Sequence, residues 1–141
     1  MAHQSRDSSV TLEIIEGKLL ATVDEMGAVM ARTSMSPVIY EVLDFACGVL
    51  TPAGELAAQM NGITLFTGTF GAQVQALMAR FEGDLAPGDV LLSNDPFAGG
   101  THACDFAIVR PVFIDGRIAA WAINVAHHLD VGGSVPGSVA P

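Results

Sequence analysis

Positively charged side chains are scarce in this sequence: six Lys and Arg stand against 15 Asp and Glu, which gives a formal net charge of -9. Nucleic acids are bound largely through clustered cations that contact phosphates, and anionic membranes attract basic segments. The charge balance therefore argues against both nucleic acid and an anionic membrane as partners.

Cysteines and long apolar runs are also scarce. Cys47 and Cys104 lie far apart without a CxxC pair, so the sequence predicts neither a disulfide framework nor a zinc knuckle. The polar start MAHQSRDSSV lacks the apolar stretch of a secretory signal, and no apolar run is long enough to span a bilayer. These features predict a cytoplasmic protein.

The glycine-rich stretches contain no phosphate-binding loop. Neither GDLAPGD (83–89) nor NGITLFTGTFG (61–71) contains the Lys that such a loop needs to hold a nucleotide. If the reaction uses ATP, we expect another chain to bind it.

Hydrophobic residues, in contrast, make up 50% of the 141 residues, enough for one core and one domain. Apolar side chains recur every three or four residues from Thr11 to about residue 33, which predicts a long helix capped by Thr11 and ended before Pro37. Residues 1–10 are expected to be disordered. The predicted buried face of the helix consists of Ile14, Ile15, Leu19, Val23, Met26, Val29 and Met30.

The remaining pattern predicts an α+β fold with two β-hairpins and a second helix. One hairpin pairs 45–50 with 56–59 around the turn TPAGE, and the other pairs 106–114 with 117–125 around Asp115-Gly116, a pair that favours a type I′ turn. A helix is expected at 72–81, burying Val74, Leu77, Met78 and Phe81, and a short strand is expected at 90–92.

The second hairpin bears on function, because each of its ends carries histidines. With the turn at Asp115-Gly116, Asp105 faces the neighbourhood of Ala126 and His127, so NDPFAGGTHACD (94–105) meets NVAHHLDVGG (124–133). Two imidazoles and a carboxylate suit zinc, manganese or iron(II) and leave positions open for water or substrate. We therefore predict a metal site of His102, Asp105 and His127. A purely structural hydrogen-bond network is the alternative, and the residues alone do not separate the two.

Other polar residues of these stretches have possible supporting roles. His128 points away from His127 on an extended strand and would contact substrate or a partner, while Asp95 and Asp130 could hold imidazole N–H groups. Asn94-Asp95-Pro96 could equally be a plain turn. The glycines that would let the loops approach a bound group closely are Gly99, Gly100, Gly132 and Gly133. Cys104, Ser134 and Ser138 are interpreted as loop residues rather than nucleophiles.

Taken together, NDPFAGGTHACD, NVAHHLDVGG and the following PGS resemble the hydantoinase B/oxoprolinase family, which includes subunits of ATP-dependent hydantoinases, 5-oxoprolinases and acetone or acetophenone carboxylases. The stretches 11–59 and 83–96 are similar to the same family. Its members are several times longer than 141 residues, so we expect 11–141 to be a single hydantoinase B-like N-terminal region of a larger family domain, truncated at its C-terminal end.

The resemblance implies a metal held by His102, Asp105 and His127. It also implies a hydantoinase A-type partner subunit that binds ATP and phosphorylates the substrate, so that the two form a hetero-oligomer. The expected activity is hydrolysis of a partner-phosphorylated cyclic amide, with His128 or Asp130 moving protons as catalytic residues. The alternatives are a subunit of an ATP-dependent ketone carboxylase and a non-catalytic assembly subunit.

Overall fold

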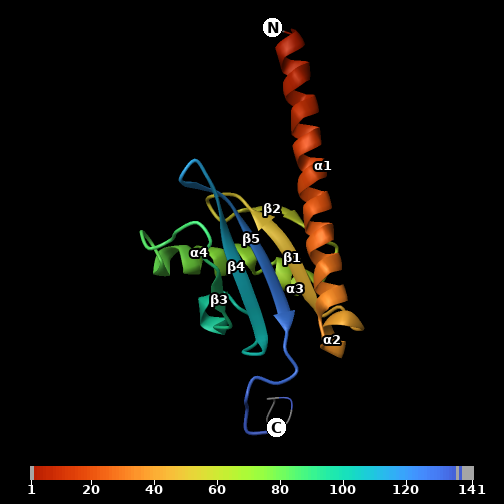
Figure 1. The fold of residues 1–141 in the computed structure, drawn as a ribbon, viewed down its shortest axis with the longest axis vertical. Helices are drawn as coiled ribbons and strands as arrows, with labels where there is room; N and C mark the ends of the chain where they lie inside the picture. The colour runs from red at the N-terminus through yellow and green to blue at the C-terminus, as the bar shows by residue number, and fades with distance from the viewer. Residues whose placement is uncertain (1, 136, 138–141) are drawn as a thin grey trace.

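The computed structural model describes residues 2–135 and 137 and has the expected α+β architecture, with a long N-terminal helix beside an antiparallel sheet (Figure 1). The elements in chain order are α1 Ala2–Thr33, α2 Pro37–Tyr40, β1 Phe45–Leu50, β2 Leu56–Gln59, α3 Thr64–Thr67, α4 Phe70–Arg80, β3 Leu91–Ser93, the 3-10 helix η1 Pro96–Ala98, β4 Asp105–Ile114 and β5 Arg117–His127. The five strands lie in the order β2-β1-β5-β4-β3.

Both predicted hairpins are confirmed. The β1–β2 turn is closed by the Thr51 N–H, which donates to the Glu55 carbonyl at 2.7 Å, and Gly54 adopts a φ of 79° within it. In the β4–β5 turn, Asp115 and Gly116 have φ values of 50° and 74°, as a type I′ turn requires. The Asp-Gly pair therefore fixes where the longest hairpin reverses.

A β-bulge adjusts the register of the β4–β5 hairpin. Ile114 lies opposite Arg117 next to the turn, but the register shifts between Val112 and Phe113. As a result Asp105 lies directly opposite His127 at the open end, within the neighbourhood that the turn predicted.

The first helix begins at Ala2 rather than at Thr11, so it includes most of the residues that we expected to be disordered. No proline or glycine precedes Gly17, so no strong helix breaker interrupts the helix before that position. The helix ends at Thr33 as predicted, and Pro37 opens the next short helix.

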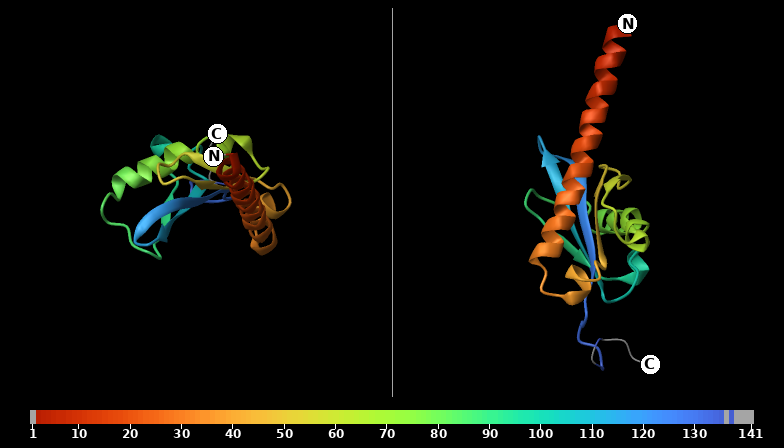
Figure 2. Two further views of the ribbon diagram at one scale, coloured as in Figure 1. Left: turned by 90° about the horizontal axis from the view of Figure 1, so that it is seen from above. Right: turned by 90° about the vertical axis from the view of Figure 1, so that its right-hand side faces the viewer.

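Helices lie on both faces of the sheet (Figure 2). On one face, α3 and α4 place Phe66, Phe70, Val74 and Leu77 against a core cluster completed by side chains of four strands, among them Trp121. The expected α4 face is confirmed, with Met78 and Phe81 half-buried at its margin. On the other face, α1 packs Val23 and Met26 against the β1–β2 hairpin.

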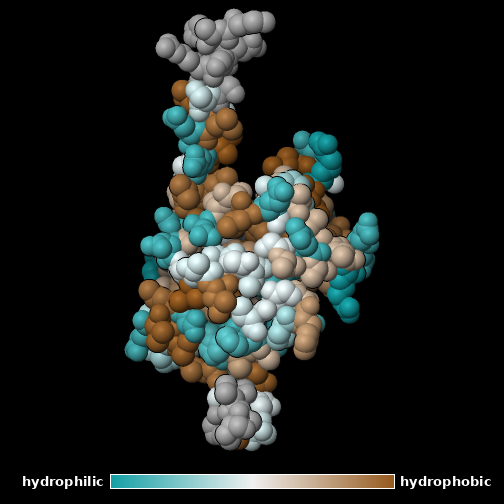
Figure 3. Space-filling view, turned by 180° about the vertical axis from the view of Figure 1, so that it is seen from behind, coloured by the Kyte–Doolittle hydropathy of each residue, from teal (hydrophilic) through white to brown (hydrophobic). Residues whose placement is uncertain are grey.

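The predicted buried stripe of α1 is only partly confirmed. Val23 is fully buried, but Ile14 and Ile15 are 53% and 49% exposed. The reason is tertiary: α1 extends beyond the end of the sheet, and its projecting part carries hydrophobic side chains toward solvent, as the brown atoms there show (Figure 3). In the described part of the chain, no helix combines the length and apolar character that crossing a membrane demands.

Candidate metal centre

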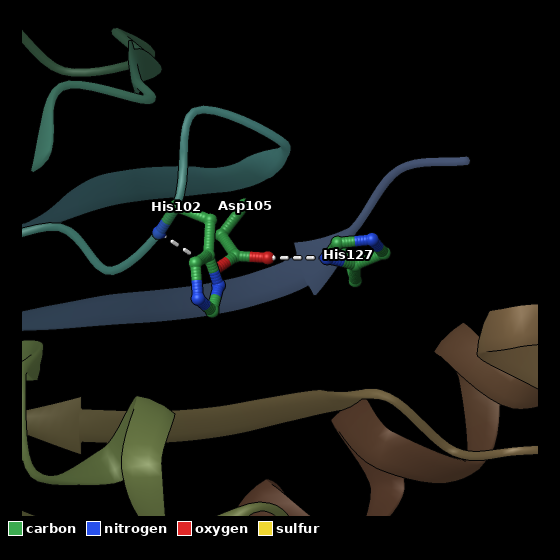
Figure 4. Close-up of side chains that lie close together, drawn as sticks. All are labelled: His102, Asp105 and His127. Atoms are coloured by element: carbon green, nitrogen blue, oxygen red, sulfur yellow. Dashed lines mark hydrogen bonds and ion pairs between the residues drawn. The ribbon is translucent and has the colours of Figure 1, made fainter. Parts of the chain in front are cut away.

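The site lies where β4 begins and β5 ends. The loop before β4 closes into a tight turn, in which the Asp105 N–H donates to the His102 carbonyl at 2.9 Å. His127 is the last residue of β5 and is anchored by its own N–H, which donates to the Asp44 carbonyl at 3.0 Å. The turn and the strand end together hold His102, Asp105 and His127 side by side, as the hairpin predicted (Figure 4).

The Asp105 carboxylate is the centre of this cluster. His127 Nδ1 lies 2.7 Å from its Oδ1, and His102 Nδ1 lies 2.8 Å from its Oδ2. The backbone N–H of His102 donates to Oδ2 at 2.9 Å, and the Thr101 hydroxyl donates to the same oxygen. Because an ionised carboxylate only accepts hydrogen bonds, both imidazoles present Nδ1–H to it. Asp105 thus links the two rings.

Burial and hydrogen bonding act in opposite directions on this carboxyl. The Asp105 side chain is 1% exposed, and burial by itself raises its pKa. The hydrogen bonds from Thr101, His127 and His102 together outweigh burial and hold the pKa of Asp105 below its ordinary value. The carboxyl is therefore ionised at neutral pH despite its burial.

The donor atoms of the cluster fit a divalent metal ion. One imidazole nitrogen from each of His102 and His127 and one carboxylate oxygen of Asp105 all lie within 4.8 Å of one another. Two ligand atoms on one ion at bond lengths of about 2.0–2.2 Å lie at most about 4.4 Å apart, so atoms within 4.8 Å of one another need at most a small shift, and nitrogen with carboxylate oxygen suits zinc, manganese or iron. The same contacts also satisfy a hydrogen-bond network, so the geometry meets the requirements of both interpretations.

The loop that carries His102 is held by hydrogen bonds within the loop and by its close approach to α4 at Gly99. Asn94 Nδ2 donates to the Ala103 carbonyl at 2.8 Å, and Asp95 Oδ1 accepts from the Phe97 N–H at 2.8 Å, which is the plain turn considered for this motif. Gly99 has a φ of 89°, and a Cβ there would lie 2.8 Å from Ala72 of α4. A side chain at this position would push the loop away from α4, and His102 with it.

The two predicted catalytic residues, His128 and Asp130, make other contacts. The ring of His128 packs edge-on against Phe106 with the centroids 4.8 Å apart, on the face of the sheet opposite to Asp105 and His127. Asp130 accepts from the Gly132 N–H at 2.8 Å and shapes the turn after β5. A catalytic role for either residue stays a prediction.

Cys104 and Ser134, both interpreted as loop residues, differ in burial. Cys104 is 5% exposed, and its carbonyl accepts from the His128 N–H at 2.8 Å, so it braces the site through its backbone. Ser134 is exposed, and Ser138 lies outside the described residues. Thr101, in contrast, was not singled out from the sequence, although its place directly before His102 in the loop was a usable signal.

Comparisons with known proteins show what this chain resembles in sequence and in fold. The chain is 35% identical over 132 residues to 5-oxoprolinase 1 of Arabidopsis thaliana, a match that covers 94% of this chain and 10% of the relative. It is 31% identical over 133 residues to the putative B-type subunit of a D-/L-hydantoinase from Pseudomonas sp. strain NS671, covering 92% of this chain and 22% of the relative. The chain thus spans between a tenth and a quarter of the length of these relatives.

Two solved structures share the fold. An ATP-dependent caprolactamase from Pseudomonas jessenii matches with a TM-score of 0.85 and 29% identity over 92% of this chain and 22% of its own. The nucleotide-free structure of acetone carboxylase, an enzyme of ATP-dependent acetone carboxylation, matches with a TM-score of 0.82 and 25% identity over 92% of this chain and 17% of its own. Finally, the sequence profile of one family, hydantoinase B/oxoprolinase, matches residues 8–141, nearly the whole chain. The chain belongs to the hydantoinase B/oxoprolinase family.

Proposed function

We propose that the chain is the metal-binding part of an ATP-dependent amidohydrolase that opens a cyclic amide. The observation that carries the proposal is the convergence of His102, Asp105 and His127 in a chain related to a 5-oxoprolinase and a caprolactamase. The coupled reaction consumes two water molecules: one is added across the C–N bond that ring opening breaks, and the other releases as phosphate the group that ATP transferred when it became ADP. The His-Asp-His cluster would act in the hydrolysis step, in which water attacks the carbonyl carbon of the amide.

Zinc, manganese or iron(II) would be held by the two imidazoles and Asp105. When bound, such an ion supplies Lewis-acid polarisation of a substrate carbonyl. The residues of this chain orient the site: the tight turn holds the backbone of His102 against Asp105, and β5 brings in His127 from the opposite strand. His128 and Asp130, which follow directly after β5, are our candidates for moving protons, and for His128 this requires its ring to leave Phe106.

ATP would be bound by a hydantoinase A-type partner in a hetero-oligomer. The sequence has no phosphate-binding loop of its own, while its relatives include one putative hydantoinase subunit and two enzymes described as ATP-dependent. In this arrangement the partner phosphorylates the amide oxygen, and the chain with the His-Asp-His cluster takes part in the hydrolysis that follows.

A second candidate function is a subunit of an ATP-dependent ketone carboxylase. The likeness to acetone carboxylase favours it specifically, because 92% of this chain superposes on that fold. In that case the same residues would face an enolate or its phosphate rather than an amide carbonyl. Assayed as a complex with its ATP-binding partner, an amidohydrolase consumes ATP with a lactam or hydantoin alone, whereas a carboxylase needs a ketone together with bicarbonate.

Metal analysis tests the shared part of both proposals. The purified chain and its complex with the partner are loaded with manganese or zinc, and bound metal is measured after gel filtration. We expect one equivalent in the wild type and a large loss in His102→Ala and Asp105→Asn. His128→Ala is the matched control, since it removes a neighbouring imidazole outside the cluster and should keep the metal. Full metal content in His102→Ala would disprove the metal centre and leave the structural network as the role of the cluster.

A further inference from the structure

The two oxygens of the Asp105 carboxylate are used unequally. Oδ2 receives three donors, namely the Thr101 hydroxyl, the His102 N–H and His102 Nδ1, while Oδ1 receives His127 Nδ1 alone. A carboxylate has about four acceptor positions, roughly two on each oxygen. Oδ2 is therefore fully occupied, and Oδ1 is the oxygen with a free position.

The donors on Oδ2 also differ in how easily they can leave. The side chain of His102 is 67% exposed, so its ring can rotate into solvent. The His102 N–H, in contrast, belongs to the turn that the Asp105 N–H closes on the His102 carbonyl, and Thr101 is the residue directly before that turn. The His102 N–H contact is lost only if the turn opens, Thr101 is only partly exposed, and the Asp105 side chain itself is 1% exposed.

We propose that Thr101 is the positioning residue of this site: with the His102 N–H, its hydroxyl immobilises Oδ2, so that Asp105 offers Oδ1 alone to a metal ion. Asp105 is then a ligand through one oxygen, aimed toward the side where His127 stands. The inference rests on the proposed metal-binding function but assigns a role to a residue outside the cluster of proposed ligands. It follows the general rule that hydrogen bonds to a ligand orient it and tune its affinity.

The test compares Thr101→Val, which keeps the shape but removes the hydroxyl, with Thr101→Ser, which keeps the hydroxyl. Thr22→Val is the matched control, because the Thr22 hydroxyl donates only to a helix carbonyl of α1, at 2.9 Å from Lys18 O. Two properties are measured on the whole chain: manganese affinity by calorimetry, and, without metal, the solvent exchange of the His127 Nδ1–H proton by NMR.

For Thr101→Val we expect manganese affinity to fall about 10- to 100-fold, as is typical when a residue that orients a metal ligand is removed. We also expect faster exchange of the His127 Nδ1–H proton in the metal-free protein, because the carboxylate can then rotate. Thr101→Ser and Thr22→Val should resemble the wild type in both measurements. This rescue by serine distinguishes positioning from a general loss of packing.

The outcomes separate this inference from the proposed function. A wild-type chain that binds no manganese or zinc contradicts the proposed function, and proton exchange in the metal-free variants then decides whether Thr101 holds the carboxylate. A wild type that binds metal together with a Thr101→Val variant of equal affinity overturns the positioning role and leaves the metal centre intact. Unchanged proton exchange in Thr101→Val overturns it in either case.

Discussion

The two faces of the sheet are covered to different extents. On the α3–α4 face, the buried side chains of four strands form one continuous cluster around Trp121 and Phe70. On the opposite face, α1 and α2 cover β1, β2 and the adjoining end of β5, while Ile108 and Val112 of β4 remain 43% and 39% exposed. A groove of about 410 Å³ follows the margin of α1 beside Asn124.

The difference in coverage between the two faces bears on the rigidity of the His-Asp-His cluster. Asp105 and His127 share the orientation of Ala107 and Val125, which belong to the continuous α3–α4 core, whereas Phe106 and His128 lie on the less covered face. A metal ligand needs a fixed carboxylate, and the packed face provides it. The less covered face provides fewer packing contacts.

Removing a large side chain from the packed face should have the largest effect. Phe70 is fully buried against the sheet, so Phe70→Ala should cost about 3–5 kcal/mol of unfolding free energy through lost burial and an unfilled cavity. Ile108→Ala, on the other face, should cost no more than about 0.5–1 kcal/mol because Ile108 is already 43% exposed. Urea unfolding measures both, and equal costs would contradict the difference between the faces.

The loop that carries His102 should be sensitive to one glycine in particular. Gly99→Ala adds strain at a φ of 89° and a contact of 2.8 Å with Ala72, which should destabilise the chain by about 1–3 kcal/mol and weaken metal binding. Gly132→Ala is the matched control, since Gly132 has a φ of 84° but nothing within 4 Å of the added Cβ. Similar losses in both variants would mean that backbone strain alone, and not contact with α4, is responsible.

Acid should remove the contribution of Asp105 to the stability of the metal-free chain. Its folded-state pKa is lowered, so the stabilisation is complete above the ordinary value of 3.8 and is lost as the pH falls through the folded-state pKa. The difference in unfolding free energy between the wild type and Asp105→Asn should therefore be constant near neutral pH and shrink below about pH 4. A difference that stays constant into this acid range would show that the charge of Asp105 is not stabilising.

The smallest expected effect is on the chemical labelling of Cys47, which lies on the face of the sheet that α1 and α2 cover. Burial raises the pKa of the Cys47 thiol to about 12, and the residue is 1% exposed beneath α1 and α2. A maleimide should therefore leave Cys47 unmodified in the native chain at pH 8 and label it in denaturant, as peptide mass spectrometry would show. Rapid native labelling would mean that α1 detaches readily, so that this face is even less well covered than the structure indicates.

Local sequence signals were sufficient for the parts of the fold that depend on neighbouring residues. Asp115-Gly116 located the reversal of the β4–β5 hairpin, and the turn TPAGE located that of β1–β2, since both turn types depend on a few residues with special φ values. Helices α2, α3 and η1 were not predicted, because three or four residues are too few to establish a helical period.

The sequence by itself determined that two histidine-bearing stretches meet at one end of a hairpin, because strand pairing follows from the position of the turn. Only the tertiary structure decided the rest. The bulge between Val112 and Phe113 set Asp105 opposite His127, the loop before β4 brought the Thr101 hydroxyl onto the carboxylate, and the projection of α1 left Ile14 and Ile15 exposed. The physical reason is that apolar periodicity and turn residues encode local geometry, whereas burial and the sharing of a carboxylate depend on segments that only folding brings together.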